Sequence, residues 1–211
     1  MIQVASNDSV FIIGSGGHAK VVIDVLSQND YKIKGVLDDN KERIGQQICG
    51  IDIIATTDYL NEIKTPSAII AIGDNKTRKL VSQRFNHVKW LTVVHPRAFV
   101  HSGADIGFGT IICAGAIVQP GARLNNHIIV NTGATVDHDC FIDSFAHIAP
   151  GANLAGSVNV AEGAFMGIGS KVIPDVQIGE WSIVGAGTTV IAPVPSNLVV
   201  VGTPARIIGK N

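Results

Sequence analysis

The sequence is poor in charged residues, in aromatic residues and in long hydrophobic runs. Only 16% of its 211 residues are charged and 5% are aromatic, whereas about a quarter of the residues in an average soluble domain are charged. So low a charge content argues against a disordered chain and against a helical bundle. The hydrophobic 46% therefore consists mainly of small and β-branched residues, and 23 glycines accompany them. This composition favours many short strands joined by tight turns.

Other absences narrow the classes of partner and the compartment. The net charge is −1, so no basic face predicts binding to nucleic acid. The longest apolar runs, such as residues 68–72, fall far short of the about 20 residues of a membrane span, and the opening MIQVASNDSV lacks the features of a secretory signal. Cys49, Cys113 and Cys140 are scattered without a CxxC pair. We therefore expect a cytoplasmic protein in its reduced state, with no zinc site and no membrane partner.

The first part of the chain, residues 1–90, alternates strand and helix signals. Buried strands are expected at residues 10–13, 33–37 and 68–72, and helices at 19–27 and 75–86. Strands that alternate with helices predict a parallel sheet. We therefore expect an α/β domain over residues 1–90.

From residue 94 a period of six replaces the helical period. At every sixth position the residue is apolar: Val94, Val100, Ile106, Ile112, Val118, Leu124, Val130, Val136, Ile142, Ile148, Leu154, Val160, Met166, Val172, Ile178, Val184 and Val190. The position four residues after each is mostly small, from Ala98 to Thr188. A fixed period of six is typical of a parallel β-helix, in which three faces make an 18-residue coil and coils stack about 4.8 Å apart. We expect this domain over residues 91–211, with a C-terminal tail.

One corner of the expected β-helix carries residues suited to acyl transfer. His138 falls at the third place of its hexad, which should face outward, and Gly156 follows it by one coil. Transfer of an acyl group from a thioester needs a base and a donor for the developing oxyanion. His138 and the N–H of Gly156 can supply these, and Asp139 can orient the imidazole. Cys140 falls in the inward column of small residues, which favours packing over a nucleophilic role.

The N-terminal segment GSGGHA, residues 14–19, fits G-x-G-x-x-A between an expected strand and an expected helix. Such a turn indicates a nucleotide site, because the helix N-terminus suits a diphosphate. About 90 residues are too few for the complete dinucleotide fold, but one βαβ half can hold a nucleotide. Asp38 and Asp39 can accept hydrogen bonds from a base or ribose. The alternative is that the glycines only make a tight turn; likewise, Lys76 and Arg78 either neutralise phosphate or cap a solvated helix.

Taken together, these segments resemble the sialic-acid O-acetyltransferase-like family of hexapeptide-repeat acyltransferases, which includes bacterial nucleotide-amino-sugar N-acetyltransferases. The segments are the hexads of residues 94–190, GSGGHAK, LDD at 37–39, AIGDNK at 71–76, NTGATVDHDC at 131–140 and VGTPAR at 201–206. The resemblance covers nearly the whole chain. It implies a Rossmann-like domain that binds a nucleotide sugar, followed by a left-handed β-helix. It also implies acetyl-CoA as co-substrate and a homotrimer with acetyl-CoA between adjacent prisms.

The activity implied is N-acetylation of a UDP-4-amino-4,6-dideoxy sugar or GDP-perosamine for surface-glycan biosynthesis. By the same resemblance, His138 matches the base and Asp139 the acid beside it. The matches to acetyl-CoA contacts are His147, Gly156, Ile168 and Ala186, the last at a place where some relatives have glycine. The matches to nucleotide-sugar contacts are Gly16, Gly17, His18, Asp38, Asp39 and Gly73.

Three alternatives remain at this point. One is O-acetylation of sialic acid or a related sugar, and another is a non-catalytic, nucleotide-binding trimeric scaffold. The third is a zinc carbonic anhydrase, since some hexapeptide-repeat proteins have this activity. That site needs three histidines, but His138 and His147 are half a coil apart and should point from different faces. We therefore expect no metal, and we expect structural roles for the remaining histidines His87, His95, His101 and His127.

Overall fold

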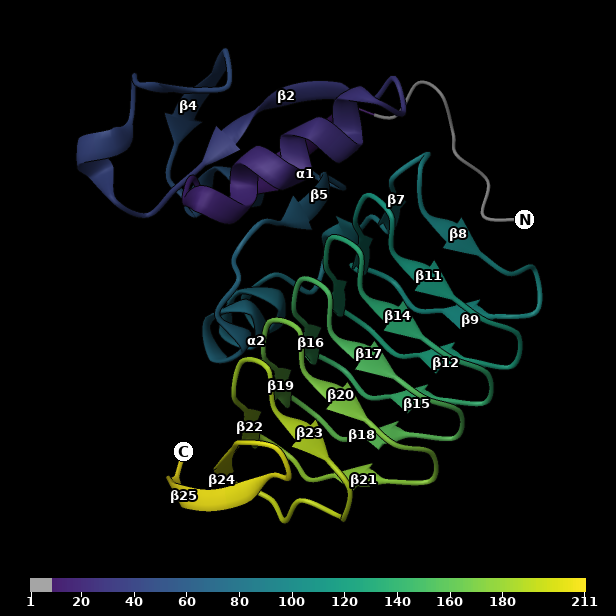
Figure 1. Cartoon of the computed structure of the whole chain (residues 1–211). Helices are drawn as coiled ribbons and strands as arrows, with labels where there is room; N and C mark the ends of the chain where they lie inside the picture. Colours follow the sequence, from purple (N-terminus) through teal and green to yellow (C-terminus); the bar gives the residue numbers. More distant parts are fainter. Residues whose placement is uncertain (1–8) are drawn as a thin grey trace.

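The computed structural model of the chain describes residues 9–211 (Figure 1). Most of the segment for which we expect no secretory signal, residues 1–8 of the first ten, lies outside the described residues. No helix within residues 9–211 is long and apolar enough to cross a membrane.

The N-terminal part is a six-stranded sheet in the order β3-β4-β2-β1-β5-β6. Its strands are β1 (Ser9–Ile13), β2 (Lys32–Leu37), β3 (Gln47–Ile48), β4 (Ile51–Ala55), β5 (Ser67–Ile70) and β6 (Lys89–Trp90). Its helices are α1 (Gly17–Ser27), α2 (Asn75–Arg84) and two short 3-10 helices, Lys41–Arg43 and Thr57–Glu62. All pairings are parallel except the β3-β4 hairpin. The Rossmann-like prediction is confirmed, and the hairpin is an addition that the sequence pattern did not predict.

Helix α1 forms because its apolar residues recur on one face. Ala19, Val22, Val25 and Leu26 are fully buried, as expected for an amphipathic helix packed on a sheet. They belong to the same apolar cluster as Val10 and Ile12 of β1. This packing fixes the turn between β1 and α1 at the edge where the parallel strands end.

The rest of the chain is a left-handed parallel β-helix. The hexad predicted the parallel β-helix, and the family resemblance implied its hand. Its first face is formed by β7 (Val93–Val94), β10 (Ile111–Ile112), β13 (Ile129–Val130), β16 (His147–Ile148), β19 (Phe165–Met166), β22 (Ile183–Val184) and β24 (Leu198–Val201), to which β25 (Arg206–Lys210) adds antiparallel. Its second face is formed by β8 (Phe99–Val100), β11 (Ile117–Val118), β14 (Thr135–Val136), β17 (Asn153–Leu154), β20 (Lys171–Val172) and β23 (Thr189–Val190). Its third face is formed by β9 (Asp105–Ile106), β12 (Arg123–Leu124), β15 (Phe141–Ile142), β18 (Asn159–Val160) and β21 (Gln177–Ile178).

Successive coils pair in the expected register, with Ile111 opposite Ile129 and Ile129 opposite His147. The hexad residues fill the interior of the prism, and from Ile112 to Val190 they are buried. Val94, Val100 and Ile106 are only partly buried, because the first coil has a neighbouring coil on one side only. The hexad therefore predicts the interior, and the position of the first coil at the end of the β-helix explains the three exceptions.

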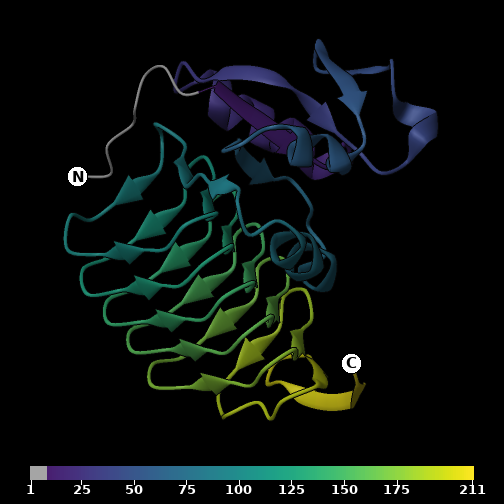
Figure 2. The same ribbon diagram turned by 180° about the vertical axis from the view of Figure 1, so that it is seen from behind.

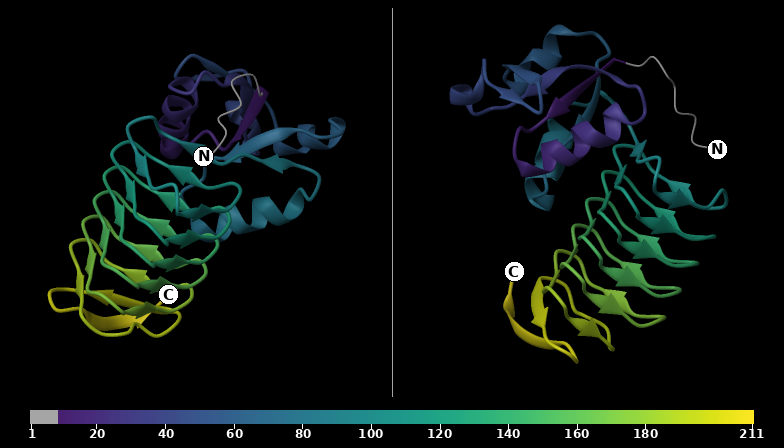
Figure 3. Two further views of the ribbon diagram at one scale, coloured as in Figure 1. Left: turned by 90° about the vertical axis from the view of Figure 1, so that its right-hand side faces the viewer. Right: turned by 45° about the horizontal axis from the view of Figure 1, so that its top comes forward.

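The two parts of the chain are packed together along the first face of the β-helix. The sheet and α1 lie over the N-terminal coils, and α2 runs beside the first face (Figures 2 and 3). Val93, Ile111 and Cys113 join the apolar cluster of α1 and the sheet. The outward residues of this face are therefore buried where those of a free β-helix would be exposed.

Candidate functional site

A cavity of about 480 Å³ lies where β1, β2 and β5 end. The carboxyl ends of parallel strands are the usual place for a ligand in an α/β sheet. All six residues matched to nucleotide-sugar contacts line this cavity, namely Gly16, Gly17, His18, Asp38, Asp39 and Gly73. The structure therefore brings together residues that are up to 57 positions apart in sequence, from Gly16 to Gly73.

The glycine turn at the cavity needs glycine for two separate reasons. Gly14 has φ +95°, and a Cβ there would stand 2.7 Å from Cγ1 of Ile72, so both conformation and space exclude a side chain. Gly16 and Gly17 have nothing within 4 Å of such an atom and leave the start of α1 open. That helix has no side-chain cap and no acidic residue in its first turn. The N–H of Ala19 donates to the carbonyl oxygen of Gly16 at 3.1 Å, and the N–H groups before it are open to an anion.

Asp38 and Asp39 are engaged within the chain itself. Oδ2 of Asp38 accepts from both the N–H and the hydroxyl of Ser15, and its Oδ1 accepts from the N–H of Asn40. Burial opposes the ionisation of Asp38, but these hydrogen bonds outweigh it and lower the pKa. For Asp39, burial is likewise outweighed by hydrogen bonds from Thr57 and the charge of Arg84, so its pKa is also lowered. Both carboxylates are ionised and shape the loops around the cavity.

Asp38→Ala is expected to weaken binding of a nucleotide diphosphate about tenfold or more, because hydrogen bonds to a charged group contribute about 1.5–3 kcal/mol. Without the carboxylate, Ser15 loses the acceptor that holds the glycine turn. Calorimetric titration with UDP and with GDP measures the effect. Asp52→Ala is the control, since Asp52 bonds only the exposed Gln47 among the contacts of its side chain within residues 9–211. Equal affinity of the two variants would contradict this role for Asp38.

Five further polar residues of the cavity were not predicted from the sequence: Ser15, Asn40, Arg43, Thr57 and Thr77. Ser15 lies inside the glycine motif, so the motif itself was an available signal. Arg43 belongs to a short 3-10 helix that no periodicity indicates, yet it supplies a cation at the cavity. Lys76 lines a different cavity.

The expectation for Arg78 was wrong in both of its forms. The residue is 1% exposed, so it does not cap a solvated helix, and it does not line the cavity at the ends of β1, β2 and β5. Its hydrogen bonds go instead to backbone carbonyl groups and to Asn75. The pattern of a polar helix gave no sign of this, because the partners lie on distant coils.

His138, Asp139 and Gly156 meet at the corner between the second and third faces of the β-helix. Nδ1 of His138 lies 2.8 Å from Oδ2 of Asp139. Since a carboxylate only accepts, Nδ1 carries the proton and Nε2 keeps its lone pair. A Cβ on Gly156 would stand 2.5 Å from Nε2, so the ring lies directly over this glycine. Within residues 9–211 the N–H of Gly156 has no hydrogen-bond acceptor.

This corner is open to solvent in the single chain, and the side chain of His138 is 59% exposed. The hydrogen bond to Asp139 raises the pKa of His138, and the charges of Asp137, Asp139 and Asp175 add to it against a smaller effect of desolvation. Asp139 has φ +59°, a left-handed conformation that turns its carboxylate back toward the ring. The arrangement makes His138 a stronger base than a free histidine.

Asp139→Asn is expected to move the acidic limb of the pH–rate profile to lower pH. A base must be neutral to accept a proton, so activity falls as the pH drops below the pKa of His138. Asp139 is the main cause that raises this pKa, and an amide removes its charge. The plateau rate falls as well, because Asn can donate to Nδ1 and select the wrong tautomer. A profile of kcat/KM measures both effects; an unchanged limb would show that another group titrates.

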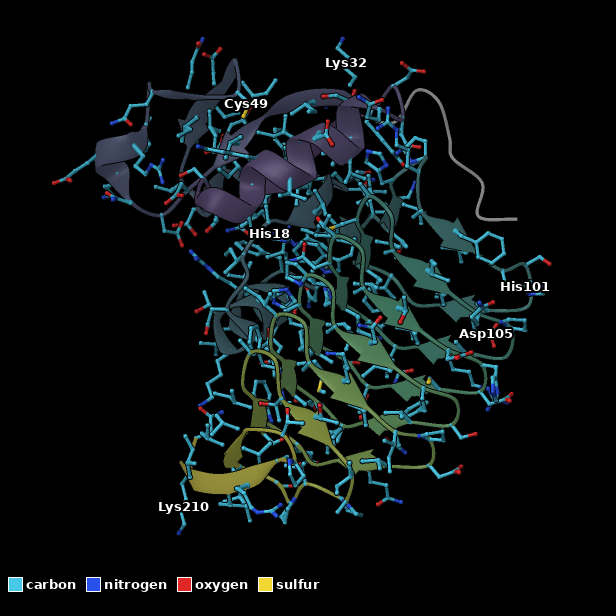
Figure 4. All side chains as sticks on the ribbon, in the orientation of Figure 1. His18, Lys32, Cys49, His101, Asp105 and Lys210 are labelled. Carbon is cyan, nitrogen blue, oxygen red and sulfur yellow. The ribbon has the colours of Figure 1, made fainter. Side chains whose placement is uncertain are left out.

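His147 lies on the first face, away from that corner. It is 8% exposed, its Nδ1 is 3.3 Å from the carbonyl oxygen of Gly73, and its Nε2 is 3.1 Å from Nδ2 of Asn131. Its ring centroid lies 6.3 Å from that of His18, which sits on the side of α1 that faces the β-helix (Figure 4). Burial, followed by the charge of Arg78, lowers the pKa of His147 to about 3 and that of His18 to about 4. Both imidazoles are neutral at physiological pH.

Ile168 and Ala186 lie one above the other at a third place, the corner between the first and second faces. The N–H of Gly187 donates to the carbonyl oxygen of Ile168 at 2.8 Å, and the Ile168 side chain is exposed. Gly169 and Gly187 have φ +65° and +67°, so small turns leave this edge accessible. The second face separates the edge from His138 within one chain.

The residues matched to acetyl-CoA contacts are therefore not gathered into one site of a single chain. Gly156 lies with His138, and Ile168 lies with Ala186 on another corner. His147 lies on the first face, next to the carbonyl oxygen of Gly73, which lines the cavity at the ends of β1, β2 and β5. Cys140 is buried, and its thiol donates to the carbonyl oxygen of Ala155, in agreement with a packing role. In the part of the chain that the structure describes, no three His, Cys, Asp or Glu side chains are grouped to hold a metal ion.

Comparison with known proteins relates both parts of the chain to sugar-modifying enzymes. The family model described as the PglD N-terminal domain matches residues 9–85. UDP-N-acetylbacillosamine N-acetyltransferase of Bacillus subtilis is 42% identical over 111 residues, which are 50% of this chain and 51% of that protein. An uncharacterized protein of Acanthamoeba polyphaga mimivirus is 34% identical over 49% of this chain and 21% of that protein. The chain thus spans about half, or less, of these curated relatives.

Several solved structures match over nearly their whole length, and two of them bear on the chemistry of the site. One is a variant of perosamine N-acetyltransferase from Caulobacter crescentus in complex with CoA and GDP-perosamine. It has 35% sequence identity and a TM-score of 0.90, and the match covers 96% of this chain and 97% of that one. The other is the acetyltransferase domain of PglB from Neisseria gonorrhoeae in complex with acetyl coenzyme A, with 32% identity and a TM-score of 0.90 over 96% of this chain and 100% of that one.

Proposed function

The chain belongs to the family of nucleotide-amino-sugar N-acetyltransferases, and we propose that it transfers the acetyl group of acetyl-CoA to the amino group of a nucleotide-linked amino sugar. The observation that carries the proposal is the environment of His138. Asp139 holds its Nδ1, while its Nε2 lies above Gly156 and has no hydrogen-bond partner within residues 9–211. This is the arrangement that a general base needs.

In the proposed reaction, His138 Nε2 accepts a proton from the amine as its nitrogen attacks the thioester carbonyl carbon. The C–N bond forms, and the N–H of Gly156 donates to the oxyanion that develops. When the C–S bond breaks, the electron pair leaves with the CoA sulfur, and the proton on His138 can pass to that thiolate. Transfer is direct within a ternary complex, because the buried Cys140 thiol has a pKa raised by burial to about 11 and does not act as a nucleophile.

The proposed acceptor is a UDP-4-amino-4,6-dideoxy sugar or GDP-perosamine destined for a surface glycan. The open start of α1 and the cation of Arg43 suit its diphosphate. The chemistry named for the relatives supports the choice, since one acts on a UDP-linked sugar and another was solved with GDP-perosamine. Gly16, Gly17, His18, Asp38, Asp39 and Gly73 are the proposed nucleotide-sugar site.

The proposed enzyme is a homotrimer whose sites lie between adjacent chains. In a single chain His138 is exposed and is separated by the second face from Ile168 and Ala186. A complete site would therefore combine His138 of one copy with the edge of Ile168 and Ala186 of another. Acetyl-CoA would run along the edge of Ile168 and Ala186, with contacts from His147 and Gly156. We place the boundary of the two domains at residues 90/91, between β6 and β7. The free thiols of Cys49, Cys113 and Cys140 favour the cytoplasm.

A substrate panel tests the function. Acetyl-CoA is offered with a UDP-4-amino sugar, GDP-perosamine or sialic acid, and released thiol is measured. Release with an amino sugar nucleotide, and mass spectrometry showing acetyl on nitrogen, is the expected result. Release with sialic acid alone would favour O-acetylation. No release, together with no acetyl-CoA binding by calorimetry, would leave a nucleotide-binding scaffold.

A further inference from the structure

The guanidinium of Arg78 joins the nucleotide domain to two coils of the β-helix. Nη1 donates to the carbonyl oxygens of Ile72 and Gly73, at 3.0 and 3.2 Å. Nε donates to the carbonyl oxygen of His127 at 2.9 Å, on one coil. Nη2 donates to the carbonyl oxygens of Phe145 and Ala146, at 2.7 and 3.3 Å, on the next.

Asn75 extends the same connection to a third coil. Its Oδ1 accepts from Nη2 of Arg78 at 2.9 Å, and its Nδ2 donates to the carbonyl oxygens of Gly163 and Ala164 at 3.0 and 3.3 Å. Asn75 is 7% exposed and Arg78 is 1% exposed. Buried polar groups with every contact made hold a unique geometry.

What the pair holds is the wall of the nucleotide cavity. Ile72 and Gly73 line that cavity, and the carbonyl oxygen of Gly73 also faces Nδ1 of His147. Arg78 therefore connects the loop after β5 to corners of the β-helix by hydrogen bonds, in addition to the packing between them. A planar guanidinium reaches several acceptors in fixed directions, which a lysine ammonium does not.

Lys79, the residue after Arg78 in α2, also contacts the β-helix but, in the described part of the chain, does not bond the cavity wall. Lys79 also ties α2 to the β-helix, through an ion pair with Glu162 and contact with the rings of Phe145 and Trp181. It makes no hydrogen bond to the cavity wall within residues 9–211. The two cations are adjacent in α2, but only Arg78 contacts the cavity backbone.

We infer that Asn75 and Arg78 are positioning residues, which hold the cavity wall at Ile72 and Gly73 in a fixed place relative to the β-helix so that the bound sugar reaches the acetyl-transfer site. The inference rests on the proposed function. The nucleotide would be held by the glycine turn and the Asp38 loop, so loss of the connection leaves nucleotide binding intact. The sugar amine would be misplaced, and a displacement of about 1 Å costs about 100-fold in rate.

Arg78→Lys tests this directly, because lysine keeps the positive charge but lacks the planar guanidinium that reaches several acceptors. With the amino sugar nucleotide that the wild-type enzyme acetylates, we expect kcat to fall about tenfold or more, with the Kd for UDP or GDP within about threefold. The matched control is Lys79→Met, which should keep kcat within about twofold. A kcat retained by Arg78→Lys, or a parallel loss of kcat and nucleotide binding, would overturn the inference.

Asn75→Asp serves if Arg78→Lys fails to fold. It keeps an acceptor for Arg78 and removes the donor to Gly163 and Ala164, so kcat should fall at temperatures at which circular dichroism shows the variant to be folded; an unchanged kcat overturns the inference. If the wild-type enzyme acetylates nothing on the panel, the proposed function has failed, and amide exchange of residues 72–75 decides the inference by itself. Faster exchange in Arg78→Lys than in Lys79→Met supports the connection, and equal exchange rejects it.

Discussion

His138→Ala is expected to lose nearly all turnover, by about 10²–10⁴-fold, while acetyl-CoA still binds. The loss follows from removing the group that accepts the amine proton, and positioned bases contribute about this factor. His138 is largely exposed and does not belong to the apolar cluster that fills the β-helix within residues 9–211, so the fold should be unaffected. Thiol release under saturating substrates gives kcat, and calorimetry gives the affinity for acetyl-CoA.

His101→Ala is the matched control for this substitution. His101 lies at the same corner of the β-helix on an earlier coil, where its Nδ1 accepts from the N–H of Gly103 at 3.0 Å. Its loss should leave kcat within about twofold, because no proton donor or acceptor at Gly156 changes. A kcat of His138→Ala near that of the wild-type chain would refute the assignment of the base. Loss of acetyl-CoA binding together with turnover would instead indicate a binding role.

The fold was predictable from the sequence because its repeat is local. Each coil needs one large apolar residue per face, and Ile112 to Val190 supply it at every sixth position. The glycine turn is equally local, since Gly14, Ser15 and Gly16 lie between β1 and the start of α1. In both regions, residues close in sequence determine the structure.

The contacts between the two parts were not predictable, because they depend on partners far apart in the chain. Arg78 lies on a helix that reads as polar and solvated, yet its acceptors on the β-helix are 49 and 67 residues away, at His127 and Phe145. His147 meets Gly73 across 74 residues. No periodicity reports which carbonyl groups converge on a side chain from different coils. Arg43 was missed for the related reason that a three-residue helix has too short a pattern.

The site at His138 lies between these cases. Its two members on adjacent coils were predictable, because the 18-residue register places Gly156 next to His138 whatever else the chain does. The exposure of the ring was predictable from its place in the hexad. The proposed contact of Ile168, Ala186 and His147 with one acetyl-CoA does not follow from the coil register, since one chain holds His147 on the first face and the other two at the corner between the first and second faces.

Gly156→Ala is expected to reduce kcat by about 100-fold without unfolding the protein, because it misplaces the base by about 1 Å or more. An added Cβ would stand 2.5 Å from both Cε1 and Nε2 of His138, which is too close for any real contact. The exposed imidazole is free to swing away, and doing so breaks its alignment with Asp139. Gly156 does not have a left-handed φ, so alanine fits the backbone and the Tm should hardly change.

This substitution tests the position of the His138 ring without removing the N–H of residue 156. Alanine keeps the backbone N–H that is proposed to bind the oxyanion, so any loss of kcat comes from the displaced ring. Gly209→Ala is the control, since a Cβ there meets nothing within 4 Å and should leave kcat unchanged. Imidazole NMR signals provide the second readout: in Gly156→Ala the pKa of His138 should fall toward its ordinary value, because the hydrogen bond to Asp139 is what raises it. A variant with full kcat and an unchanged pKa of His138 would show that activity does not depend on the position of the ring over Gly156, and it would contradict the assignment of His138 as the base.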